Sequence, residues 1–204
     1  MKYKLVFIDD SMKGELDDIP FVKAISKFLT DAEIEIFDNP QKGLEFVLDN
    51  LNNKIIVFVD CKFEGYGLQG INILKKIRAQ TSLLYIVMMS ANAINQMYSA
   101  DVIEMINEDY ICFFDRNNGT VSDACDLIKR ICNLWETRFD CILEDWLVSH
   151  PEDNYKEAFT LASTNKTYTW ADILVELRLQ TNIGKSFEQT LNKYYIYQIT
   201  RSKK

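Results

Sequence analysis

The sequence predicts an α/β protein built on a five-stranded parallel sheet and followed by a helical extension. Three observations lead to this prediction: five short, mainly apolar runs, the amphipathic segments between them, and the carboxylates that follow several of these runs. Apolar runs without polar alternation are typical of strands buried on both faces of a sheet. Strands that alternate with helices give a doubly wound sheet, with right-handed crossovers that place helices on both faces.

The first half of this sheet begins at the N-terminus. Residues 3–8 (YKLVFI) form an apolar run that ends in two aspartates. Residues 18–20 (DIP) predict a helix start, with an aspartate cap and a proline in the first turn. A short alternating strand is expected at 33–37, and residues 38–40 (DNP) predict a second helix that ends near residue 51.

The same alternation continues through the second half of the sheet. Residues 54–60 (KIIVFVD) are the most hydrophobic strand candidate and end on a single aspartate. A helix is expected over 70–79, after a loop that contains two glycines. The remaining elements are a strand at 83–89, a weaker helix over 93–106 and a strand at 109–114.

A long helix is predicted next, because apolar residues recur at spacings of four and three without a helix breaker before Pro151. This helix exceeds the length needed to cover the sheet, so its second half must pack on another surface. The chain's own C-terminal helices and a second copy in a homodimer are both open as that surface. The recurring residues are Val121, Cys125, Ile128, Cys132, Trp135, Phe139, Ile142 and Trp146.

Beyond Pro151 the chain is expected to be entirely helical. Thr169 is predicted to cap one of these helices, with Asp172 three residues later in a variant of the capping box. The predicted domains are residues 1–135 and a helical extension, residues 136–204, that continues from the long helix. The expected helices of the extension cover 152–162, 170–180 and 185–199, with a turn at 165–167 and a break at 181–184.

Composition and charge limit the location and the partners of the protein. Apolar residues make up 48% and charged residues 26% of the chain, as in ordinary globular proteins. Neither a signal peptide nor a run long enough to cross a bilayer is present, so a cytoplasmic protein without membrane insertion is expected. Residues 1–150 carry a net charge of −9 and residues 151–204 a net charge of +2. An acidic body of this kind argues against nucleic acid as the main partner.

Several classes of site are excluded by the residue counts. The single histidine, His150, cannot supply a histidine-based metal site or a catalytic triad. The five cysteines are odd in number and form no C-x-x-C pair, which favours free thiols.

Polar side chains gather where the predicted strands end. In open α/β sheets, ligands bind beyond the carboxyl ends of the strands. Carboxylates that meet there repel one another and require a cation, and ligands that are all oxygen favour Mg²⁺. A hydroxyl and a fixed positive charge beside that metal suit a phosphoryl group. The residues in question are Asp9 and Asp10, Asp60, Ser90, and Asp115 with Arg116.

Asp60 is the candidate nucleophile. It stands alone at the end of the central strand, whereas Asp9 and Asp10 form a pair suited to metal binding. A carboxylate can attack phosphorus and form an acyl phosphate.

These motifs resemble the receiver domain of two-component response regulators over residues 3 to about 135. No part of residues 136–204 resembles a known output family. The resemblance is carried by Ile8-Asp9-Asp10, Asp60, the segment from Gly70 to Arg78, Met89-Ser90-Ala91, and Phe113-Phe114-Asp115-Arg116.

The resemblance implies a sheet in the order 2-1-3-4-5 and phosphotransfer to Asp60 from a partner histidine kinase or phosphotransfer protein. It implies an acceptor protein of a phosphorelay and not an enzyme that turns over substrate. Ser90 would sense the phosphoryl group, and Phe113 would be the switch residue. The implied Mg²⁺ ligands are Asp9, Asp10, Asp60 and the backbone carbonyl of Lys62.

Two departures from the family pattern keep other functions open. Receivers place a lysine where this chain has Arg116, and the loop between Asp60 and Gly70 lacks the usual proline and is longer. Arginine is planar and fork-shaped, so its reach toward a phosphoryl oxygen differs from that of lysine. The expected function is phosphoryl acceptance with output by protein contact. The alternatives are a pseudo-receiver that binds partners without phosphorylation, and a DNA-binding transcriptional regulator.

Overall fold

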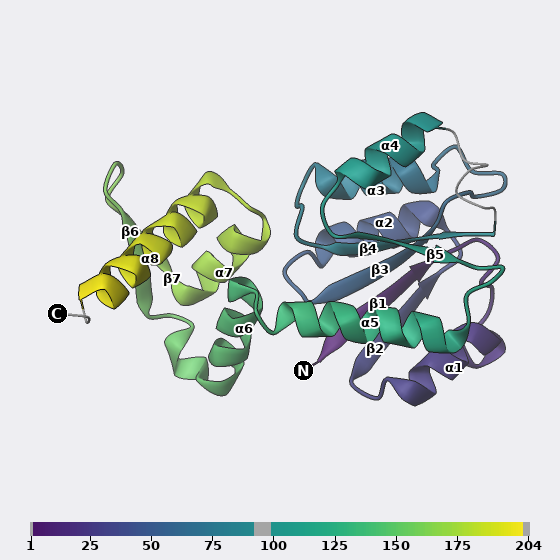
Figure 1. Cartoon of the computed structure of the whole chain (residues 1–204), viewed down its shortest axis with the longest axis horizontal. Coiled ribbons are helices and arrows are strands. Elements are labelled where there is room, and N and C mark those ends of the chain that lie inside the picture. The colour runs from purple at the N-terminus through teal and green to yellow at the C-terminus, as the bar shows by residue number, and fades with distance from the viewer. Residues whose placement is uncertain (1, 92–98, 202–204) are drawn as a thin grey trace. The chain divides into compact units, whose positions relative to one another are not determined.

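The computed structural model describes residues 2–91 and 99–201 of the chain. The chain divides into two compact units, residues 1–135 and residues 136–204 (Figure 1). In the described residues, no helix combines the length and the hydropathy that a bilayer crossing requires.

The first unit contains the predicted five-stranded parallel sheet. Its strand order is β2-β1-β3-β4-β5, which confirms the predicted topology. The register aligns the ends of neighbouring strands, pairing Asp60 with Met89 and Ser90 with Asp115. The strands are β1 (Tyr3–Ile8), β2 (Ala32–Phe37), β3 (Ile55–Asp60), β4 (Tyr85–Ser90) and β5 (Ile111–Asp115).

Helices cover both faces of this sheet (Figure 1). Helices α1 and α5 contact each other on one face, and α2 and α3 contact each other on the other. The bounds are α1 (Pro20–Phe28), α2 (Pro40–Asp49), α3 (Gly70–Arg78), α4 (Ser99–Asn107) and α5 (Val121–Trp135).

The predicted starts of α1, α2 and α3 are confirmed, although the cap of α1 is not the predicted aspartate. The side chain of Asn39 caps α2 by accepting hydrogen bonds from the backbone N–H groups of Gln41 and Lys42. The N-cap of α1 is Ile19, because Asp18 belongs to a preceding 3₁₀ turn, Leu16–Asp18. The predicted helix over 93–106 corresponds to α4 from Ser99 onward, and residues 93–98 lie outside the described residues.

Aromatic packing closes the core of the first unit. Phe7 stacks on Phe58 between neighbouring strands, with ring centroids 4.8 Å apart. At the last residue of α5, the indole of Trp135 packs edge-on against Tyr3 and Tyr85, at 5.9 and 6.1 Å. Trp135 is only 2% exposed. Its side chain is therefore buried within the first unit, and it does not start a seam that continues along the chain.

The single long helix predicted from Val121 to Pro151 is wrong. Helix α5 ends at Trp135, and after three intervening residues α6 covers Phe139–Ser149. The break is stabilised by Arg138, the N-cap residue of α6, whose backbone is extended. Its guanidinium donates to both carboxylate oxygens of Asp140, at 3.0 and 2.8 Å.

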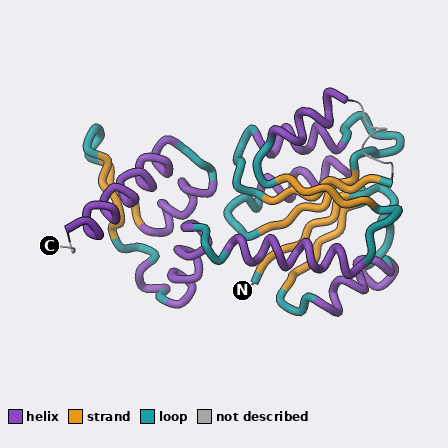
Figure 2. The backbone as a smooth tube through the Cα atoms, in the orientation of Figure 1, coloured by secondary structure: helices purple, strands orange, loops and turns teal. Residues whose placement is uncertain are grey.

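The second unit contains a β-hairpin as well as helices, so the prediction of an entirely helical extension is wrong (Figure 2). The predicted helix over 152–162 is instead the 3₁₀ turn Pro151–Asp153 and strand β6 (Glu157–Leu161). Strand β6 pairs antiparallel with β7 (Lys166–Thr169). Thr169 caps α7 (Trp170–Arg178) in a capping box with Asp172, as predicted. Helix α8 (Asn182–Arg201) starts within the segment predicted as a break.

The buried face of α6 also differs from the predicted seam. Ile142 and Trp146 belong to the seam, yet they are 49% and 52% exposed. Leu143 and Leu147 are buried in their place. They join a core formed with Tyr168, Ile173, Leu177 and Phe187.

Candidate functional site

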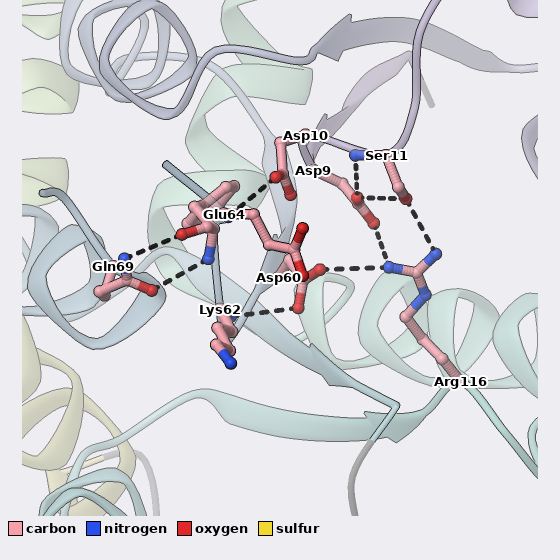
Figure 3. Close-up of polar contacts among 9 residues, drawn as sticks. Asp9, Asp10, Ser11, Asp60, Lys62, Glu64, Gln69 and Arg116 are labelled. Atoms are coloured by element: carbon pink, nitrogen blue, oxygen red, sulfur yellow. Dashed lines mark hydrogen bonds and ion pairs between the residues drawn. The ribbon is translucent and has the colours of Figure 1, made fainter. Parts of the chain in front are cut away.

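The sheet brings three carboxylates together at the carboxyl ends of its central strands. Asp60 is the last residue of β3, and Asp9 and Asp10 directly follow β1. One carboxylate oxygen from each of the three lies within 4.8 Å of the others. Figure 3 shows these side chains converging with Ser11 and Arg116. The convergence predicted at this edge is therefore present for the three carboxylates and Arg116.

Asp9 is fully buried and both of its carboxylate oxygens are held. One oxygen accepts hydrogen bonds from the backbone N–H of Ser11 at 2.9 Å and from the Ser11 hydroxyl at 2.6 Å. The other accepts from the Arg116 guanidinium at 2.5 Å. Burial of a carboxylate is costly unless it is paired and hydrogen-bonded, and this side chain has both kinds of partner.

Arg116 connects two of the three carboxylates through one nitrogen. Its Nη1 lies 2.5 Å from Asp9 Oδ2 and 3.2 Å from Asp60 Oδ2. Its Nη2 donates to the Ser11 hydroxyl at 3.2 Å, which fixes the plane of the guanidinium (Figure 3). The fork of arginine can hold these partners at the same time, whereas the single ammonium of lysine has a different geometry.

Asp60 is less accessible and more basic than an ordinary aspartate. Burial, followed by the charge of Asp9, raises the pKa of Asp60 from 3.8 to about 6. The Lys62 backbone N–H, which donates to Asp60 Oδ1 at 3.2 Å, and Arg116 oppose this rise. A carboxylate with a raised pKa holds its proton more tightly and is a stronger base when ionised.

Asp10 ties the β1 end to the loop that follows Asp60. Its Oδ2 accepts the backbone N–H of Glu64 at 2.9 Å. The side chains of Asp10, Asp60 and Ser90, with Lys62, line one open pocket. Ser90 is only 4% exposed, so it contributes little open surface to this pocket.

The other residues singled out at the strand ends have separate surroundings. Asp115 is turned into its own loop, where it accepts the backbone N–H of Asn117 at 2.9 Å and the side-chain amide of Asn118 at 2.8 Å. The Asn118 and Asn117 hydrogen bonds hold the pKa of Asp115 below its usual value. Phe113 is half-buried, whereas the neighbouring Phe114 is buried and packs against Phe21.

Two residues that shape the site, Ser11 and Gln69, were not predicted from the sequence. Gln69 donates to the carbonyls of Phe63 and Tyr66, at 3.0 and 2.8 Å, and accepts the Phe63 N–H at 2.9 Å. It also forms a capping box with Asn72 at the start of α3. The polar residue before Gly70, with Asn72 three positions later, is the sequence signal for that cap. Nothing local indicates its bonds to the loop.

Gly70 allows α3 to approach the end of β3 closely. A Cβ atom at this position would overlap the carbonyl oxygen of Asp60 and lie 2.9 Å from the Cα of Cys61. Glycine is the residue that permits such an approach. Cys61 itself has its pKa raised to about 12, mainly by burial, so its thiol is not activated as a nucleophile.

The donor set fits a hard divalent cation. All three side chains that face one another offer carboxylate oxygens, and the adjacent loop offers backbone carbonyls, the ligands that Mg²⁺ prefers. The geometry can therefore hold a cation between Asp9, Asp10 and Asp60. Arg116 already neutralises part of the same negative charge.

Comparisons with known proteins agree with this architecture. No family model and no curated protein matches the sequence. A response regulator receiver domain protein from Clostridium thermocellum matches in structure with a TM-score of 0.52 and 19% identity, over 66% of this chain and 97% of that chain. A fusion protein with the trimeric coiled coil of yeast Spc42 matches with a TM-score of 0.50 and 16% identity, over 74% of this chain and 94% of that one.

A third solved structure is the receiver domain of NtrX from Brucella abortus. It has 20% identity and a TM-score of 0.46, and covers 62% of this chain and 95% of that chain. The C-terminal part of the chain is not matched by these receiver domains. The sheet order 2-1-3-4-5 and the match in structure show that about two thirds of this chain have the fold of response regulator receiver domains.

Proposed function

We propose that residues 1–135 are a phosphoryl-accepting receiver module, with Asp60 as the acceptor and a histidine kinase or phosphotransfer protein as the donor. The observation that carries this proposal is the meeting of three carboxylates within 4.8 Å, at the carboxyl ends of β1 and β3. Arg116 lies in contact with two of them. The module is proposed as an acceptor and not as an enzyme that turns over substrate.

The chemistry would be attack of the Asp60 carboxylate on the phosphorus of a phosphohistidine donor. The phosphorus–nitrogen bond of the donor breaks and an acyl phosphate forms on Asp60. Asp60 suits this role because its raised pKa of about 6 still leaves it mainly ionised at neutral pH. The Lys62 N–H and the Arg116 guanidinium orient its two oxygens.

A bound Mg²⁺ would neutralise negative charge on the carboxylates and on the phosphoryl oxygens. Asp9, Asp10, Asp60 and the backbone carbonyl of Lys62 are the proposed ligands. Ser11 and Arg116 would keep the Asp9 carboxylate in place when a metal or a phosphoryl group changes the charge of the site. Ser90, which lines the same pocket, would donate its hydroxyl to the phosphoryl group.

Output is proposed to pass through protein contact, with Phe113 as the switch residue. Phe113 is half-buried, so its ring would be able to gain or lose contacts on phosphorylation. In the described part of the second unit, basic side chains do not cluster on one helix. Helix α8 carries only Lys185, Lys193 and Arg201 over its 20 residues. A DNA-reading helix normally presents a basic face, so protein contact is favoured over DNA binding.

Intact mass spectrometry after incubation with acetyl phosphate and Mg²⁺ tests the proposal. The expected product carries one added phosphoryl group, which is absent in Asp60→Asn and when the metal is chelated. Asp126→Asn is the matched control, since Asp126 is an exposed aspartate within α5. Labelling that persists in Asp60→Asn would contradict the assignment of the acceptor.

A pseudo-receiver is the second candidate, and one observation favours it. Arg116 is already paired with both Asp9 and Asp60, at 2.5 and 3.2 Å, so a metal and a phosphoryl group would both have to compete with this pairing. The Arg116→Lys variant separates the two candidates. A wild type without any adduct, together with a labelled Arg116→Lys variant, would identify a receiver fold that arginine keeps unphosphorylated.

A further inference from the structure

The second half of α8 is an apolar helix without cover from its own unit. Every residue from Asn192 to Arg201 is exposed, and we call this segment the α8 arm. It spans about 15 Å, at about 1.5 Å of rise per residue. Its large apolar side chains are between 50% and 64% exposed: Tyr194, Tyr195, Ile196, Tyr197 and Ile199.

Such an arm is unusual because short helices depend on burial of an apolar face. An isolated helix of this length is marginal in water. The first half of α8 has that burial, since Gly184 and Phe187 are buried, but the arm does not. Contiguous exposed apolar side chains of this kind mark an interaction surface.

A groove of matching character lies between α6 and α7 of the same unit. Its volume is about 420 Å³, and it is lined mainly by apolar side chains. Val148, at the rim, is 76% exposed. None of the residues that line this α6–α7 groove belongs to the arm, so the arm does not occupy the groove of its own chain. The lining includes Glu144, Leu147, Val148, Pro151, Leu174 and Val175.

The charges of the arm and of the groove are opposite. The arm has two basic residues, Lys193 and Arg201, and no acidic residue. Residues 139–153, which form α6 and the turn after it, have five acidic residues and no lysine or arginine. Asp140 and Glu144 are ion-paired with arginines outside this range, and Asp153 is paired with Lys156. The exposed carboxylates of this range are Asp145, one helical turn before Val148 on α6, and Glu152 in the turn after α6.

We infer that the α8 arm of one copy docks into the α6–α7 groove of a second copy of this chain. The chain carries both halves of the contact, so two copies can exchange arms reciprocally and close a two-fold symmetric dimer. Each contact would bury aromatic and aliphatic side chains of the arm in the groove. The basic residues of the arm would lie against the acidic rim.

Measurement of molecular mass across a range of concentrations tests this dimer with the full chain. Sedimentation velocity of the wild type is expected to show a dimer whose association weakens as salt is raised. The arm variant Ile196→Glu/Ile199→Glu and the groove variant Val148→Glu should each be monomeric. These positions are exposed, so their melting temperatures should match that of the wild type. The control Ile106→Glu, at an equally exposed position on α4, should remain dimeric.

Mixing the two monomeric variants gives the decisive result. The groove variant keeps an intact arm and the arm variant keeps an intact groove, so one contact can form between them. The mixture is therefore expected to contain a heterodimer, weaker than the wild-type dimer. Pairing of α8 with α8 would give no heterodimer and would overturn the inference. A wild type that is monomeric at all concentrations, or a dimer that persists in the arm variant, would do the same.

Discussion

Each of the two units holds a cluster of charged side chains, and the two clusters are built differently. In the first unit, Asp9, Asp10 and Asp60 meet around Arg116, and an open pocket adjoins them. In the second unit, Asp140 and Glu144 are bound by two arginines. Arg138 holds Asp140 at 2.8 Å, and Arg178 reaches Asp140 at 3.3 Å and Glu144 at 2.9 Å.

The pKa values of Asp140, in the second unit, and Asp60, in the first unit, are shifted in opposite directions. Burial would raise the pKa of Asp140, but the hydrogen bonds and charges of Arg138 and Arg178 outweigh burial and hold that pKa below its usual value. At Asp60, burial and the charge of Asp9 prevail, and the pKa rises to about 6. A cluster with matched charges stabilises the fold. A cluster with excess carboxylate destabilises it, and a bound cation would offset that excess.

The largest effect is expected from Asp140→Ala. This substitution leaves Arg138 and the almost fully buried Arg178 without the carboxylate that both of them contact. Removing one partner of a buried ion pair typically costs about 3–5 kcal/mol. Denaturant unfolding and hydrogen exchange of the second unit measure this loss. Asp145→Ala, at an exposed position on the same helix, should have little effect, and equal losses in the two variants would contradict the comparison.

Gly70→Ala is expected to displace the carboxylate cluster of the first unit without removing any of its charges. The new methyl group would overlap the Asp60 carbonyl, so α3 or the β3 end must shift, at a cost of about 1–3 kcal/mol for such overpacking. Phosphoryl labelling of Asp60 should fall together with the free energy of unfolding. Gly67→Ala is the matched control, because no heavy atom lies within 4 Å of a Cβ at that position. Normal labelling in Gly70→Ala would show that the approach of α3 is not needed.

Asp60→Asn is expected to act in the opposite direction and stabilise the protein. The folded-state pKa of Asp60, about 6, lies above its ordinary value of 3.8. Between these two values the folded state binds more protons, so stability falls as pH rises through this window. The variant should remove that pH dependence and gain about 1–2 kcal/mol at pH 7. Urea unfolding from pH 4 to 7 measures both effects. A pH profile unchanged from the wild type would contradict the raised pKa.

The smallest effect is the response to Mg²⁺. Binding to the folded state alone should raise stability by about 1.4 kcal/mol when free metal is ten times its Kd. Asp10→Asn should reduce the resulting shift in melting temperature, whereas Asp126→Asn should keep it. A wild type that is insensitive to millimolar Mg²⁺ would count against a metal site between the carboxylates.

The sheet was predictable because each of its signals is local. An apolar run such as 54–60 indicates a buried strand whatever the rest of the chain does. Parallel strands also bring their carboxyl ends to one edge, so Asp9, Asp60 and Arg116 could be placed together from the order of the motifs. The roles assigned to these residues, and to Ser90 and Phe113, remain predictions.

The second unit was less predictable because its folding depends on distant pairs. The buried Asp140 is bound by the nearby Arg138 and also by Arg178, 38 residues away, and no local pattern shows the second contact. The spacing of Ile142 and Trp146 continues the apolar seam, yet the buried face of α6 lies elsewhere. The β6 segment lacks clear strand alternation. It is held by pairing with β7 across a turn in which Asn165 has a positive φ of 54°.

The loop after Asp60 combines length with little conformational freedom. The Cys61 N–H donates to the Met89 carbonyl at 2.8 Å, and the Phe63 N–H donates to Gln69 at 2.9 Å. Lys62 is therefore the one residue between two anchored neighbours, and its own N–H is bound to Asp60. Ordering a backbone residue costs about 1–2 kcal/mol in conformational entropy. Lys62 is already ordered in the folded protein, so ligand binding would not add this cost. A ligand that binds the Lys62 carbonyl would therefore meet a backbone that is already held on both sides.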